Sequence, residues 1–254
     1  MSGLITRRGA MGGLVAGAGG LLLAGCDRVA GSGAAQQAFR GAENLSYRAQ
    51  RLLTARDALA PEFGRGDLSP VFRSNGTAMP ASPDYARLLA GGFGDWRLAV
   101  GGMVARPLSL SLEQIGRLPQ RTQITRHDCV EGWSAIGQWT GVPLSVILRA
   151  AGLAQSARYI VFHCFDDFGG NAYYESIDLV DAFHPQTILA WALNGHRLPV
   201  PNGAPLRLRV ERQLGYKHAK FLRGIEAVAS LSPVGRGKGG FWEDDSDYAW
   251  YAGI

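Results

Sequence analysis

The sequence predicts an α+β fold, with irregular mixed sheets and short helices, for a domain over residues 69–254. Runs with strand character are short, and short helices interrupt them without the regular strand–helix alternation of a Rossmann fold or an α/β barrel. The chain has 254 residues, of which 46% are hydrophobic, so it is long enough to bury one sizeable core. No internal repeat is visible.

Each element has its own local signal. Apolar runs predict strands at residues 96–104, 108–110, 121–126, 159–165, 187–193, 206–211 and 225–231. A helix is predicted at 111–118 because Ser111 and Gln114 have the spacing of a capping box. A second helix is predicted at 143–151, ending at Gly152, and a third, short one after Ser176. Asn194-Gly195 is typical of a hairpin turn.

The start of the chain has the pattern of an export signal over residues 1–25. Arg7-Arg8 resembles a twin-arginine signal, with a plain Sec lipoprotein signal as the alternative, and the apolar run that follows is short for a membrane span. Leu23-Ala24-Gly25-Cys26 resembles a lipobox, which predicts a lipid anchor at Cys26. Asp27 then favours retention in the bacterial inner membrane, facing the periplasm. Residues 26–68 are predicted to be a tether, partly helical.

Charge and cysteine content narrow the possible partners. Removal of Arg7 and Arg8 with the signal lowers the net charge from +5 to +3, and no basic stripe interleaved with aromatic residues follows, so no nucleic-acid partner is expected. With Cys26 acylated, Cys129 and Cys164 remain and could form one disulfide. The sequence contains no CxxC, no HExxH and no cluster with zinc spacing.

Cys129 is the residue most suggestive of chemistry. Arg126, His127 and Asp128 precede it and Glu131 follows, whereas a structural cysteine more often lies in an apolar run. From these residues alone, Cys129 is a metal-bound thiolate, a catalytic nucleophile or a half-buried thiol.

Three separated segments carry a resemblance to a known family. They are Cys129–Ser134 with Trp139 and Gly141, Asn194-Gly195 with Asn202–Leu208, and Gly215–Lys220 with the tail Gly240–Glu243. Together they resemble the sulfite oxidase family of molybdopterin enzymes, close to the bacterial periplasmic branch that includes the methionine-sulfoxide reductase catalytic subunit. The resemblance runs from about Phe72 to the C-terminus, and it implies a sulfite-oxidase-type molybdopterin-binding fold.

The resemblance also implies roles for individual residues. Cys129 would ligate molybdenum, and a soft thiolate suits such a metal. Arg126 is the candidate for contact with substrate. The residues expected to hold Mo-molybdopterin are Arg73, Ser74, Asn75, Cys129, Cys164, Asn202, Arg207, His218, Ala219 and Lys220. Cys164 stands where close relatives have a threonine, and Arg209 is expected to face water.

The implied reaction is oxygen-atom transfer to or from a small sulfur-containing substrate. Electrons would pass to or from a separate partner, a cytochrome or a membrane haem protein, since the chain has no haem-binding CxxCH. Two alternatives from other classes stay open. One is a hydrolase with Cys129 as nucleophile and His127 or His163 as base, and the other is a non-catalytic lipoprotein that acts as a binding module.

Overall fold

The structure is a computed structural model that describes residues 32–254. The chain divides into two compact units, the first ending at Leu53 and the second beginning at Thr54. The described part of the first unit is one helix, α2 (Gly33–Leu53). The predicted export signal and Cys26 lie outside the described residues. Among the helices of residues 32–254, none combines the length and the apolar character needed to span a bilayer.

The second unit begins earlier than the domain start predicted at residue 69. The amide of Phe63 donates to the carbonyl of Ile124, and the amide of Ala60 donates to the side chain of Gln186. These bonds tie residues that were placed in the predicted tether to the body of the unit.

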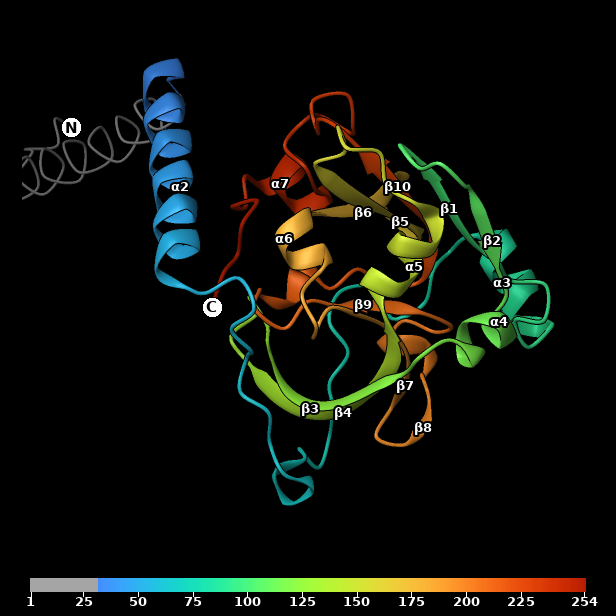
Figure 1. The fold of residues 1–254 in the computed structure, drawn as a ribbon. Helices are drawn as coiled ribbons and strands as arrows, with labels where there is room; N and C mark the ends of the chain where they lie inside the picture. Colours follow the sequence, from blue (N-terminus) through green and yellow to red (C-terminus); the bar gives the residue numbers. More distant parts are fainter. Residues whose placement is uncertain (1–31) are drawn as a thin grey trace, which may run out of the picture. The chain divides into compact units, whose positions relative to one another are not determined.

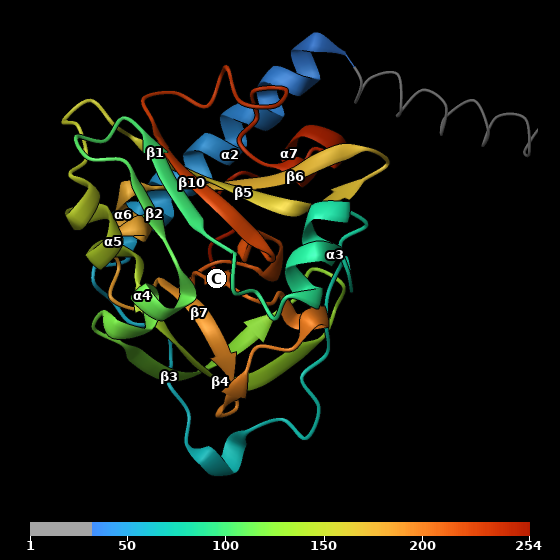
Figure 2. The ribbon, with the colours of Figure 1, turned by 90° about the vertical axis from the view of Figure 1, so that its right-hand side faces the viewer.

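Two five-stranded sheets form the second unit, and they lie as separate layers (Figures 1 and 2). In the first sheet the order is β2-β1-β10-β5-β6; in the second it is β3-β4-β7-β8, with β9 also paired to β7. The strands of the first sheet are β1 (Leu98–Gly102), β2 (Leu108–Leu110), β5 (Tyr159–Phe168), β6 (Asn171–Asp178) and β10 (Leu222–Val228). Those of the second are β3 (Arg121–Asp128), β4 (Ser134–Pro143), β7 (Ile188–Leu193), β8 (His196–Arg197) and β9 (Arg207–Arg209). Only β1 and β10 pair in parallel among the described ladders; the rest are antiparallel.

Short helices connect and cover these strands. They are α3 (Pro83–Ala90), α4 (Leu112–Arg117), α5 (Leu144–Ala151), α6 (Leu179–Ala182), α7 (Phe241–Ser246) and the 3-10 turns η1 (Arg65–Asp67), η2 (Val200–Asn202) and η3 (Gly215–Lys217). Mixed sheets with short helices confirm the predicted α+β class.

The main core is one cluster of buried side chains that draws on both sheets and on α5. Val100, Phe162 and Ile225 come from the first sheet, and Leu208 from the second. Ile147 belongs to the apolar face of α5 that the sequence predicts. Burial of side chains of this size contributes about 1.5–3 kcal/mol each to folding. The core therefore fixes the ends of the strands that carry the site.

Several local predictions are confirmed. Ser111 and Gln114 form the capping box of α4, and Gly152 ends α5 in the left-handed region. Asn194 and Gly195 both have positive φ and join β7 to β8 in a hairpin.

Two local predictions are wrong. Ser176 starts no helix: it lies inside β6, where its hydroxyl donates to the carbonyl of Gly239 and accepts from Trp250, and Asp178 is the residue that caps the following helix. The possible disulfide is absent, since Cys129 and Cys164 are both free.

Candidate functional site

Cys129 lies in a tight turn between β3 and β4. Its amide donates to the carbonyl of Trp133 at 2.9 Å, and the amide of Gly132 donates to the Cys129 carbonyl at 3.0 Å. Gly132 has φ 86°, a conformation that favours glycine. The side chain of Asp128 accepts a hydrogen bond from the Ser134 hydroxyl across the same turn. These contacts hold the thiol in one place at the end of β3.

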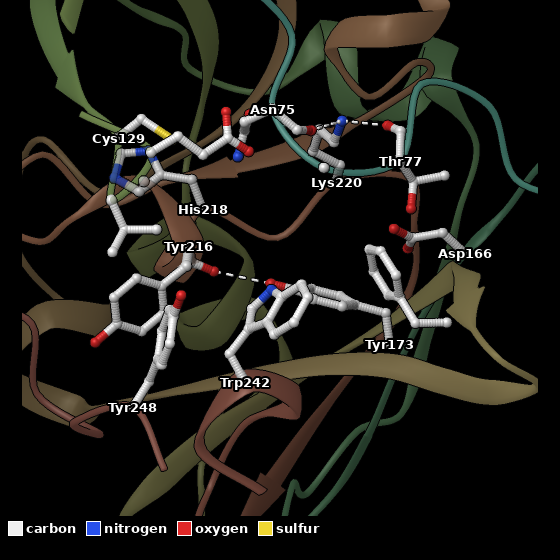
Figure 3. Close-up of a pocket in the computed structure, with 15 residues that line it drawn as sticks. Asn75, Thr77, Cys129, Asp166, Tyr173, Tyr216, His218, Lys220, Trp242 and Tyr248 are labelled. Carbon is white, nitrogen blue, oxygen red and sulfur yellow. Dashed lines mark hydrogen bonds between the residues drawn. The ribbon is translucent and has the colours of Figure 1, made fainter. Parts of the chain in front are cut away.

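The Cys129 thiol faces a pocket of about 670 Å³, measured out to its open mouth (Figure 3). Five stretches far apart in the sequence form its wall: residues 75–77, 129–131, 166–173, 215–220 and 242–248. Burial raises the pKa of the Cys129 thiol above its ordinary value, and the neighbouring Glu131 carboxylate adds to the shift. A free nucleophilic cysteine needs a lowered pKa, so this surrounding disfavours the hydrolase alternative.

His127 and His218 lie beside the inner end of this pocket. Their rings meet edge to face, with centroids 5.0 Å apart. Burial, reinforced by the guanidinium of Arg209, lowers the pKa of both well below the usual value, so both rings are neutral. His163, the other base considered for a hydrolase, bonds to Glu226 and is not among the residues that line the pocket.

Arg207 reaches this region from β9 and is fully buried. Its Nη1 donates to the carbonyl of Asn202 at 2.9 Å and its Nη2 to the carbonyl of His218 at 3.3 Å. The guanidinium lies over the Trp139 ring, 5.1 Å from the centroid. Burial and the adjacent Arg209 lower its pKa to about 9, so it still carries a positive charge at neutral pH.

Arg209 corrects a prediction, because it does not face water. It is fully buried, and two of its nitrogens bond to the two carboxylate oxygens of Glu211. A third nitrogen bonds to Nδ1 of His127 at 2.9 Å, and the guanidinium lies 4.4 Å from the centroid of Trp139. This closed ion pair fixes the orientation of the His127 ring.

Lys220 fastens the loop of residues 75–77 to the pocket wall. Its ammonium donates to the carbonyls of Asn75, Thr77 and Pro201. Burial and the charge of Arg207 lower its pKa to about 7. All three ammonium protons are occupied by these carbonyls, so Lys220 offers positive charge to the pocket rather than a spare donor.

A set of buried polar atoms has no hydrogen-bond partner among the described residues. Around the site they are Asn75 Oδ1, His127 Nε2, Asp166 Oδ1, Asn202 Nδ2, Arg207 Nε and His218 Nδ1. Each unsatisfied buried group costs about 1–3 kcal/mol, and native interiors contain few of them. Donors and acceptors concentrated in this way fit a polar, anionic ligand with its own donors and acceptors, which is the chemistry of molybdopterin.

Four of the predicted cofactor residues line the pocket, namely Asn75, Cys129, His218 and Lys220. Asn202 and Arg207 lie behind them with an unpartnered nitrogen each. Ala219 is buried and is not among the residues that line the pocket, and its carbonyl accepts from the amide of Leu208.

Other predicted residues are not brought to the pocket. Arg73 and Ser74 are exposed. Cys164 is buried in the core opposite Leu222. Arg126 lies on the opposite face of β3 from His127 and bonds to Asp128.

Sequence reasoning missed the carboxylate at the far side of the pocket. Asp166 is buried, and Figure 3 shows it across the pocket from Cys129. Burial raises its pKa to about 6, against the opposing charge of Lys220. The Asp166-Asp167 pair at the end of an apolar strand was the signal that could have found it.

The aromatic rim of the pocket was also missed. Trp242 and Tyr248 are stacked with centroids 6.0 Å apart, and Tyr216 meets Tyr248 edge to face at 5.0 Å. These rings come from α7, from the segment after it and from η3. A salt-bridge cluster behind the rim holds them: Lys217 donates to Glu175 and to Glu243, both at 2.5 Å.

Known proteins have sequences similar to that of this chain. Residues 90–233 match the family model described as the oxidoreductase molybdopterin binding domain. The putative protein-methionine-sulfoxide reductase subunit YedZ1 of Azospira oryzae is 42% identical over 158 residues, which cover 62% of this chain and 56% of that protein. The protein-methionine-sulfoxide reductase catalytic subunit MsrP of Xanthomonas axonopodis pv. citri is 34% identical over 172 residues, 63% of this chain and 52% of that protein.

The chain thus spans about half the length of the curated relatives it matches. Among solved structures, the sulfane dehydrogenase SoxCD from Paracoccus pantotrophus is similar, with a TM-score of 0.49 and 25% identity. That similarity covers 54% of this chain and 39% of that one.

Proposed function

Because the chain belongs to the family of oxidoreductases with a molybdopterin-binding domain, we propose that it reduces sulfoxides by oxygen-atom transfer, with Cys129 as the protein ligand of molybdenum. The family confirms the expected enzyme class and the expected cofactor, Mo-molybdopterin. The observation that carries the proposal is the Cys129 thiol, held by a rigid turn at a pocket whose wall contains unpartnered buried donors and acceptors.

The residues around Cys129 suit the cofactor in charge and in hydrogen bonding. Arg207 and Lys220 give the pocket a positive charge that favours the phosphate of molybdopterin. The unpartnered oxygens of Asn75 and Asp166 would accept from N–H groups of the pterin. Nε2 of the neutral His218 ring donates to the carbonyl of Gln213, so its free Nδ1 would also act as an acceptor. When bound, the cofactor supplies a metal that takes the oxygen atom and cycles two electrons.

The chain's own contribution is binding and orientation. The closed Arg209–Glu211 pair and the turn around Cys129 keep the ligand sulfur in place without reorganisation. The aromatic rim of Trp242, Tyr248 and Tyr216 offers an apolar contact for the carbon groups on either side of a sulfoxide. In the balanced reaction, a sulfoxide, two electrons and two protons give a thioether and water.

Methionine sulfoxide is the proposed substrate. The support is that the relatives from Azospira oryzae and Xanthomonas axonopodis are named as methionine-sulfoxide reductase subunits, and that the pocket opens to solvent. The two electrons would come from a separate protein, a cytochrome or a membrane haem protein; the word subunit in the relatives' names favours such an assembly.

Activity with a chemical electron donor tests this function. The purified holoenzyme, with a reduced viologen dye as donor, should oxidise the dye when methionine sulfoxide is added. Cys129→Ser should abolish this activity, whereas Cys164→Ser, the same change at the other buried free cysteine, should retain most of it. Molybdenum-loaded protein that oxidises sulfite but leaves methionine sulfoxide unchanged would overturn the proposed direction.

We also propose that the protein is exported and attached to the inner membrane through lipid on Cys26. The support is the sequence pattern Leu23-Ala24-Gly25-Cys26 after Arg7-Arg8, which lies outside the described residues. Mass spectrometry of the N-terminal peptide should show a diacyl modification on Cys26, and Cys26→Ser should remove it. An unmodified N-terminal peptide from the native host would contradict the anchor.

A further inference from the structure

Helix α2 separates its residues by chemistry into two faces. With about 100° between successive residues, Phe39, Ala42, Leu45, Ala49 and Leu52 fall within one half of its circumference. Ala34, Ala35, Ala38, Gly41 and Leu53 fall in the same half, and Ser46 is the one hydroxyl among them. The two faces are therefore an apolar face and a polar face along the whole length of the helix.

The polar face carries a positive charge. Arg40, Arg48 and Arg51 all lie on it, with Glu43 as the single acidic residue of the helix. Tyr47 lies on the same face and its ring is 5.4 Å from the guanidinium of Arg51. An excess of cations opposite an apolar face is the composition of helices that lie at the surface of an anionic bilayer.

Among the described residues, the large side chains of the apolar face are exposed. The exposed fraction is 52% for Phe39, 70% for Leu45, 86% for Leu52 and 84% for Leu53. Large apolar side chains exposed in a continuous row mark an interaction surface. The helix is unbroken from Gly33 to Leu53 (Figure 1), so the row from Phe39 to Leu53 extends over roughly 21 Å at 1.5 Å per residue.

We propose that α2 lies in the plane of a membrane surface, with its apolar face among the outer acyl chains and its arginines toward anionic headgroups. Two features favour a bilayer over a second copy of the chain. The apolar face is wide and rich in alanine, whereas a helical dimer needs a narrow seam of large residues every three and four positions. The charge of the polar face complements phosphatidylglycerol rather than another basic helix.

The consequence is a second membrane contact, independent of any lipid on Cys26 and of the reaction in the pocket. A basic amphipathic segment binds anionic membranes through its buried apolar area and its charge, so it would add to any attachment through lipid. A helix that lies flat would also restrict the distance between the membrane and the chain that follows it.

A fluorophore sensitive to polarity tests which face of α2 enters the bilayer. Asn44→Cys and Leu45→Cys are adjacent positions, the first on the polar face and the second on the apolar face. Both changes are made in a Cys26→Ser background, so that neither lipid nor label is attached at residue 26. Each purified variant is labelled, and the Cys26→Ser parent, in which Cys129 and Cys164 are buried, is the blank. On addition of vesicles that contain phosphatidylglycerol, the label at 45 should brighten severalfold and shift to shorter wavelength, while the label at 44 should change little.

Three outcomes would overturn the proposal. The two labels could respond equally to vesicles, which would show that the apolar face does not enter the bilayer in preference to the polar face. The label at 45 could respond to protein concentration without vesicles, which would make the face a contact between copies. Arg40→Gln with Arg48→Gln could leave the response to phosphatidylglycerol unchanged, although loss of two cations should weaken it severalfold.

Discussion

Lys217 and Lys220 lie three residues apart, are both buried, and have opposite electrostatic surroundings. Lys217 sits between the carboxylates of Glu175 and Glu243, which raise its pKa despite burial. Lys220 bonds only to backbone carbonyls, and burial lowers its pKa to about 7. The first charge is neutralised within the protein, and the second is available to whatever fills the pocket.

This difference separates a structural cation from a functional one. The Lys217 cluster joins β6, η3 and α7 behind the aromatic rim, and both of its carboxylates are fully buried. Lys220 and Asp166 instead line the pocket, and unpartnered polar atoms that include Nε of Arg207 lie around it. Loss of each lysine should therefore appear in a different measurement.

The largest effect is expected for Lys217→Met. It leaves Glu175 and Glu243 buried without a cation, and loss of one partner of a buried ion pair costs about 3–5 kcal/mol. The free energy of unfolding, from urea titration, measures this. Glu243→Gln keeps one ion pair to Glu175 and should cost clearly less. Equal losses for the two variants would show that Lys217 does not balance both carboxylates.

Asp166 should make the free energy of unfolding of the cofactor-free protein depend on pH. Its pKa is 3.8 in ordinary surroundings and about 6 in the folded protein. Between about pH 4 and 6 the folded state binds more protons than the unfolded state, so the free energy of unfolding falls as pH rises, by up to about 3 kcal/mol. Asp166→Asn should remove this fall, and Asp167→Asn should leave it in place. An unchanged pH dependence in Asp166→Asn would show that its carboxyl is not the group that titrates.

Lys220→Gln should lower the free energy of unfolding only modestly, but it should strongly reduce the amount of cofactor that the protein retains. Loss of donors to the carbonyls of Asn75 and Thr77 costs about 1–3 kcal/mol, but the pocket also loses a cation that attracts an anion. Molybdenum per folded chain, by elemental mass spectrometry, should fall well below the wild-type value. Arg223→Gln removes an exposed cation close in sequence, and this variant should retain its molybdenum. If both variants lost the same amount of molybdenum, the effect would come from the change in net charge and not from the position of Lys220.

Gly215→Ala should destabilise the protein about as much as Lys220→Gln. A methyl group there would lie 2.5 Å from Nε2 of His127, so the ring or η3 must shift, at a cost of about 1–3 kcal/mol. Activity should fall more than stability, because the strand that carries His127 leads directly to Cys129. Gly101→Ala, where a methyl group meets nothing within 4 Å, should be nearly neutral in both measurements. A neutral Gly215→Ala would mean that His127 has room to move.

The sequence was most informative where the signal is local. The turn at Asn194-Gly195, the cap at Ser111 and the termination of α5 at Gly152 depend on neighbours within a few residues. The segments around Cys129 and Lys220 were recognisable because a family shares them. Asn75 was found by the same resemblance, and it does line the pocket.

What the sequence did not reveal depends on distant contacts. β6 is buried on both faces, so its residues do not alternate, and Ser176 resembled a helix cap although its partners are Gly239 and Trp250. Arg209 is buried because Glu211 and Trp139 surround it, which no spacing along the chain indicates. The aromatic rim arises only when the tail folds back onto η3.

X-ray absorption at the molybdenum edge tests the central claim most directly, since it counts the sulfur atoms bound to the metal. Wild-type protein should show three sulfur ligands, two from the dithiolene and one from Cys129, and metal retained in Cys129→Ser should show two. Cys164→Ser should keep the wild-type spectrum. The same number of sulfur ligands in wild type and in Cys129→Ser would contradict Cys129 as the molybdenum ligand.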